Sequence, residues 1–84
     1  MKTLTVRVLR RHIKKGNKDT ITMCPIALAL KDMGFNLPRV YACGSIRHTR
    51  NTYAEYNTMV ANFIDSFDSG KPVSPFSFKL RIEE

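Results

Sequence analysis

The sequence predicts an α+β domain in which a small, mostly antiparallel sheet of about four strands is covered on one face by two helices. Apolar and polar residues alternate over residues 4–8 and again over residues 76–82, which is typical of half-buried strands. Between these strands, residues 25–33 and 59–67 repeat apolar side chains at helical spacing. Strands with one polar face need helices on their other face only.

Length and composition indicate one domain that spans residues 1–84. The chain has 84 residues, 43% of them hydrophobic, which is enough for a single core. A domain of this size buries only about 60% of the surface of its unfolded chain, so pairing with further copies would add stability, and a homo-oligomer is one expectation. The sequence has no secretory signal and no long apolar run, so we expect a cytosolic protein without a membrane partner.

A short helix is expected over residues 9–15, directly after the first strand. Its spacing places Leu9 and Ile13 on the inner face. The basic side chains would then point outward: Arg10, Arg11, Lys14 and Lys15. Gly16 is expected to end this helix, because glycine readily adopts a positive φ.

The second helix, over residues 25–33, begins with proline at its first position and ends at Gly34. Phe35 is expected to fold back onto Leu30, as is common after a glycine cap. Only Lys31 and Asp32 give this helix a polar face, so we expect either the sheet or another copy of the chain to bury it on most sides.

A strand is predicted over residues 39–43, and residues 52–56 are expected to form a second strand that pairs with it. The polar segment between them, residues 47–51, would form the basic tip of a hairpin.

Asn57 or Thr58 is expected to cap the third helix, and Gly70 to end it. Its apolar stripe comprises Met59, Val60, Phe63, Ile64 and Phe67. Asp65 and Asp68 lie off this stripe. They are compatible with acid–base or metal chemistry, but a solvated helix surface is the favoured interpretation because neither a histidine nor a further acid accompanies them.

Three segments carry a resemblance: HIKKG (12–16), CPIALAL (24–30) and FIDSFDSGKPVSPFSF (63–78). In this order and spacing the chain resembles a group of short bacteriophage-encoded proteins of unassigned function. The resemblance covers most of the chain and is weakest over residues 39–56. It implies a phage origin and a location in the cytoplasm of the infected bacterial host, and it implies no catalytic or binding residues.

Patterns for catalysis, metals and cofactors are weak. Cys24 starts a helix, where a thiol can become reactive, and His12 or His48 could serve as its base. We favour the simpler interpretation of Cys24 as a small buried residue, since no third residue to orient such a pair is evident. The isolated cysteines and histidines form no zinc pattern, and no glycine-rich phosphate loop is present. We therefore predict no enzyme, no metal and no cofactor.

Charge is the strongest functional signal. Fourteen Lys and Arg against seven Asp and Glu give a net charge of +7, which favours an anionic partner, although solubility alone is an alternative. One basic cluster comprises Arg7, Arg10, Arg11, His12, Lys14, Lys15 and Lys18. The other comprises Arg39, Arg47, His48 and Arg50, followed by Tyr53 and Tyr56. Arginine binds phosphate oxygens bidentately and tyrosine stacks on bases. The predicted ligand-binding residues are Arg47, His48, Arg50, Tyr53, Arg10, Arg11 and His12.

These observations favour a phage counter-defence protein that binds and sequesters an anionic host molecule without turnover. A nucleotide signal is the favoured ligand. The alternatives are a nucleic-acid-binding protein, a protein–protein inhibitor of a host defence enzyme and, ranked last, an enzyme that uses Cys24.

Overall fold

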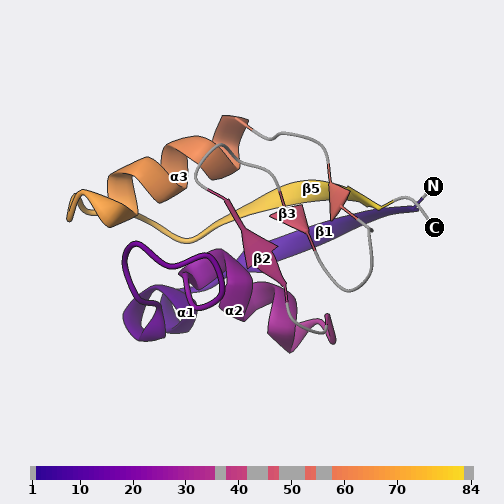
Figure 1. Cartoon of the computed structure of the whole chain (residues 1–84), viewed down its shortest axis with the longest axis horizontal. Coiled ribbons are helices and arrows are strands. Elements are labelled where there is room, and N and C mark those ends of the chain that lie inside the picture. Colours follow the sequence, from indigo (N-terminus) through magenta and orange to yellow (C-terminus); the bar gives the residue numbers. More distant parts are fainter. Residues whose placement is uncertain (1, 36–37, 42–45, 48–52, 55–57, 83–84) are drawn as a thin grey trace.

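A computed structural model of the chain describes residues 2–35, 38–41, 46–47, 53–54 and 58–82. The elements follow in the order β1 (Lys2–Val8), α1 (Arg10–Lys15), α2 (Pro25–Asp32), β2 (Arg39–Val40), β3 (Ile46–Arg47), β4 (Tyr53–Ala54), α3 (Thr58–Asp68) and β5 (Phe76–Ile82). This order of helices and strands confirms the α+β class (Figure 1).

The first and last strands lie side by side. β1 pairs with β5 in antiparallel register over seven residues, from Lys2 opposite Ile82 to Val8 opposite Phe76. In the middle of the chain, β2, β3 and β4 form an antiparallel meander, and β4 also contacts β5. The strands of the described residues thus form two adjacent small sheets, of two and three strands, in place of the predicted single sheet of about four.

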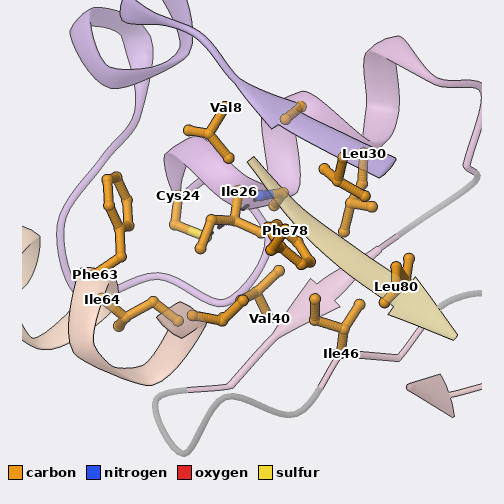
Figure 2. Close-up of a cluster of buried hydrophobic side chains, with 14 of the residues drawn as sticks. Val8, Cys24, Ile26, Leu30, Val40, Ile46, Phe63, Ile64, Phe78 and Leu80 are labelled. Carbon is orange, nitrogen blue, oxygen red and sulfur yellow. Dashed lines mark hydrogen bonds between the residues drawn. The ribbon is translucent and has the colours of Figure 1, made fainter. Parts of the chain in front are cut away.

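A single hydrophobic core joins the terminal strands to the helices. In β1, Val6 and Val8 are buried, whereas the alternating residues Thr5 and Arg7 are exposed. The strand therefore buries one face only. Figure 2 shows Val8, Phe78 and Leu80 of the strands close to side chains of α2 and α3. The helices contribute Ile26, Ala27, Ala29, Leu30, Val60, Phe63, Ile64 and Phe67.

Helix α1 occupies the predicted position, and Ile13 of its predicted inner face packs against the core, but Leu9 does not. Leu9 is 41% exposed and Ile13 is only partly buried, whereas the polar His12 is 5% exposed. Gly16 does follow the helix, but its φ of −69° is not left-handed. A Cβ atom at Gly16 would come within 2.6 Å of Cδ of Pro25. This position therefore requires glycine because α2 begins so close to it.

Helix α2 begins and ends as predicted. Pro25 is its first residue, and Cys24 precedes it as the N-cap. Gly34 has a φ of +97°, and the amide of Phe35 donates to the carbonyl of Leu30 over 3.1 Å, which is the bond of a left-handed glycine cap.

Helix α3 ends at a second left-handed glycine, Gly70, whose φ is +81°. Four residues of the predicted apolar stripe are buried, but Met59 is 54% exposed, so its inclusion was wrong. The helix starts at Thr58, and the alternative cap at Asn57 lies outside the described residues. None of the helices within the described residues has both the length and the apolar character needed to cross a membrane.

The predicted hairpin over residues 39–56 was wrong in its pairing. Ile46 and Arg47 form β3, which lies between β2 and β4, so Arg47 belongs to a strand and not to a tip. Val40 and Ile46 are buried and anchor the meander to the core (Figure 2). The remainder of the predicted tip, including His48 and Arg50, lies outside the described residues.

Candidate anion-binding site

A pocket of about 210 Å³ lies between α1 and α2, which pack against each other. Its lining comprises Arg11, His12 and Lys15 from α1 and Leu28, Lys31 and Asp32 from α2. The pocket thus combines three cationic side chains, one carboxylate and one imidazole around an apolar side chain.

His12 has both ring nitrogens engaged. Its Nδ1 accepts a hydrogen bond from the backbone N–H of Leu9 over 2.9 Å, and its Nε2 lies 2.6 Å from Oδ2 of Asp32. An Nδ1 that accepts a bond carries no proton, which assigns the proton to Nε2 and makes the ring the donor to Asp32. His12 is the third residue of α1, where glutamate or glutamine commonly reaches back to the N-cap amide. His12 therefore holds the helix start and orients Asp32, with no ring nitrogen left for a ligand.

Asp32 receives a second donor from the same helix. Nη2 of Arg11 lies 3.0 Å from the same Oδ2 that His12 contacts. The hydrogen bond from His12, with smaller effects from the charges of Arg11 and Lys15, holds the pKa of Asp32 below its ordinary value of 3.8, although some desolvation opposes the shift. Asp32 is therefore ionised at neutral pH, and one of its oxygens is already shared by two donors.

Positive charge remains in excess around the pocket. Arg11 is 64% exposed and uses one of its five N–H donors on Asp32, so its other donors can reach a ligand. Nζ of Lys31 donates to the sulfur of Met23 over 3.3 Å, and a thioether is only a weak acceptor. Lys15 is exposed. Against three cations, one carboxylate leaves two positive charges to attract an anion.

Of the three consecutive residues 10–12 that were predicted to bind a ligand, the pocket brings together only two. Arg11 and His12 line the pocket, whereas Arg10 is exposed and does not line it. Successive residues of an α-helix are rotated by about 100° around its axis, so three neighbours in sequence cannot all face one pocket.

A second basic group lies on the meander. Arg39 is opposite Arg47 in the β2–β3 pair, and Tyr53 is opposite Arg47 in the β3–β4 pair. Arg39 and Arg47 are both exposed. Like charges directly opposite each other repel. Two of the predicted residues, Arg47 and Tyr53, are thus neighbours across a strand pair, while His48 and Arg50 lie outside the described residues.

Cys24 has the environment of a structural residue. It lies among buried side chains (Figure 2), and its sulfur accepts a hydrogen bond from the amide of Ala27 over 3.4 Å. Burial raises the pKa of the Cys24 thiol, which outweighs the opposite effect of the helix amides. Because the thiolate is the reactive form, these surroundings favour the structural interpretation of Cys24.

Asp68 ties a loop to α3. Its Oδ1 accepts a hydrogen bond from the backbone N–H of Asp19 over 2.9 Å. Asp19 has a positive φ of 57°, and no other non-glycine residue within the described part of the chain does.

The other acidic residue of the predicted pair, Asp65, is exposed. Within the part of the chain that the structure describes, no three His, Cys, Asp or Glu residues gather closely enough to hold a metal ion.

Sequence reasoning missed Leu28, Lys31 and Asp32 as parts of a site. The available signal was that Lys31 and Asp32 are the only polar pair on an otherwise apolar helix. That signal marks an exposed face, but it does not show which other element lies beside it.

Comparisons of the chain with protein-family models, with curated proteins and with solved structures found no match.

Proposed function

We propose that this protein binds a phosphate-bearing small molecule without turnover, with the phosphate held in the pocket between α1 and α2. The observation that supports this most is the gathering of Arg11, Lys15 and Lys31 from two helices around one pocket. Guanidinium groups bind phosphate oxygens bidentately, and ammonium groups add compact positive charge.

The size of the pocket bears on how much of a ligand it holds. Sites for drug-sized ligands usually enclose about 300–1,000 Å³, and this pocket is smaller, at about 210 Å³. It suits a phosphate and the group attached to it. The rest of a nucleotide would lie on the outer surface or against a second copy of the chain, so binding is expected to favour a homo-oligomer.

The biological setting follows from the resemblance to short phage proteins. In the cytoplasm of an infected host, a protein that holds a nucleotide signal would act as a counter-defence sponge. Such a sponge requires affinity but no catalytic group. A nucleotide signal is therefore the ligand that we propose.

Calorimetry with a panel of linear and cyclic nucleotides tests the proposal. At least one nucleotide should release heat on binding. Lys15→Glu should weaken that binding at least about 10-fold, because a charge-assisted hydrogen bond contributes about 1.5–3 kcal/mol.

Lys14→Glu is the matched control. Lys14 lies next to Lys15 on α1 and is also exposed, but it does not line the pocket. Both variants change the net charge by the same amount. Equal weakening by both would show that only overall charge matters, and the absence of heat with every nucleotide would refute the proposal.

A further inference from the structure

The β1–β5 pair has an outward face of unusual composition. Alternate residues of both strands are exposed over residues 3–7 and 77–79, on the side opposite the buried valines, phenylalanine and leucine of the core. The exposed residues that the structure describes on this face are Thr3, Thr5, Arg7, Ser77 and Lys79. All of them carry either a hydroxyl group or a positive charge.

The register pairs one hydroxyl with one cation at three successive positions. Thr3 is opposite Arg81, Thr5 is opposite Lys79, and Arg7 is opposite Ser77. In the central pair, Nζ of Lys79 donates to Oγ1 of Thr5 over 2.7 Å, which holds the lysine across the two strands. The pattern is therefore a repeat along the pair and not a single basic spot.

Acidic residues are missing from both strands. The chain has seven Asp and Glu, yet residues 2–8 and 76–82 contain none, against four Lys and Arg. A carboxylate opposite a cation stabilises a strand pair. Within residues 2–8 and 76–82 no carboxylate lies opposite these cations, and a negatively charged partner molecule would complement them.

The chemistry of the face favours nucleic acid over protein. The cores of protein interfaces are enriched in aromatic residues, methionine and arginine and depleted in lysine and serine. Arg7 would suit such a core, but the exposed residues described on this face include no aromatic residue and no methionine, and they do include Lys79 and Ser77. Phosphate oxygens are the usual acceptors of bonds from arginine, lysine, serine and threonine in protein–DNA complexes. Alternate strand residues lie about 6.7 Å apart, so the hydroxyl groups and cations form an extended row along the strands, as contact with several phosphates of a backbone requires.

We propose that the outward face of the β1–β5 pair binds the phosphate backbone of double-stranded nucleic acid without reading its base sequence. This surface is separate from the α1–α2 pocket, and either proposal can fail alone.

Fluorescence anisotropy with two labelled DNA duplexes of unrelated sequence tests the inference. Both duplexes should bind with similar affinity, and the affinity should fall steeply between about 50 and 200 mM salt. In the double variant Arg7→Gln, Lys79→Gln, the slope of log affinity against log salt should be smaller by about 2, since each phosphate contact contributes about 0.9.

The control removes two charges elsewhere, with Arg10→Gln and Lys14→Gln on the exposed side of α1. Its slope should remain that of the unmodified protein. The single variant Arg7→Gln keeps the hydrogen bond between Lys79 and Thr5 and should lower the slope by about 1. This variant still tests the inference if the double variant fails to fold. The double variant should still bind nucleotides in calorimetry.

Three results would overturn the inference. They are an absence of duplex binding at low salt, an equal loss of slope in the control variant, and a strong preference for one of the two sequences.

Discussion

His12 shows how one residue can connect a helix start to a binding pocket. Its two ring nitrogens bridge the amide of Leu9 and the carboxylate of Asp32, which belong to different parts of the chain. The ring is almost fully buried, so water cannot easily replace either bond. Together with Arg11, the ring of His12 thereby positions the carboxylate at the edge of the pocket.

Replacing His12 should therefore cost stability. His12→Ala leaves the amide of Leu9 without its acceptor and removes one of the two donors to Asp32, and we expect a loss of about 1–3 kcal/mol in the free energy of unfolding, measured with urea. His12→Gln should recover part of this loss, because glutamine can accept the N-cap amide in the same helical position. An alanine variant as stable as the unmodified protein would contradict these roles for His12.

Asp32 predicts a dependence of stability on pH. Its pKa is lower in the folded chain than the ordinary value of 3.8, so its contribution is present above that value and is lost as the pH falls through the lowered pKa. Asp32→Asn should be less stable than the unmodified protein at about pH 7, and the difference should vanish towards about pH 2. The exposure of Asp32 and screening by salt keep the effect modest. A difference that persists at the lowest pH would refute the assignment.

At the scale of elements, the junction of α1 and α2 depends on the lack of a side chain at Gly16. Gly16→Ala places a methyl group against the ring of Pro25 and should lower stability by about 1–3 kcal/mol, as overpacking does. Thermal unfolding provides the measurement.

Gly34 provides the contrast, because its position has open space but a left-handed φ of +97°. There alanine should cost about 1–2 kcal/mol, and asparagine, which tolerates this conformation, should cost less than alanine. At Gly16 asparagine should be no better than alanine. Rescue of Gly16 by asparagine would indicate that conformation, and not crowding, decides that position.

The elements that the sequence predicted well are those with a long repeat. The strand over residues 76–82 buries Phe78 and Leu80, and the helices around Leu30 and Phe63 bury most of their expected residues, with Met59 as an exception. Both helices end at left-handed glycines, as expected. The strands β2, β3 and β4 have two residues each, which is too short for any periodicity. Their pairing depends on contacts with the core through Val40 and Ile46, so local patterns gave the wrong partner.

The same limit applies to the pocket. Basic residues next to each other in sequence suggested one cluster at 10–12, but the helix turns Arg10 away and brings Lys31 and Asp32 from α2 beside Arg11. On the inner face of α1 the prediction was right for Ile13 and wrong for Leu9, because the hydrogen bonds of His12 bury its ring and leave Leu9 exposed. Sequence patterns indicate which residues are polar, and the packing of α1 on α2 decides which of them meet.

At the scale of the whole molecule, the two ends of the chain carry much of the fold. β1 and β5 pair along their full length and bury one face in the core that α2 and α3 complete. Their other face remains outside and carries hydroxyl groups and positive charge. Part of the positive charge thus lies around the α1–α2 pocket, where we propose that one phosphate group binds, and part lies on this strand face, where we propose that a row of phosphates binds.

The most direct test of phosphate binding in the α1–α2 pocket is a nuclear magnetic resonance titration of the ¹⁵N-labelled protein with inorganic pyrophosphate. The backbone amides of Arg11, Lys15 and Lys31 should shift in a saturable manner, together with their neighbours on the two helices. The amides of β5 should shift much less at the concentrations that saturate the pocket. An absence of saturable shifts in α1 and α2, or equal shifts over all basic surfaces, would contradict the proposal that this pocket holds a phosphate.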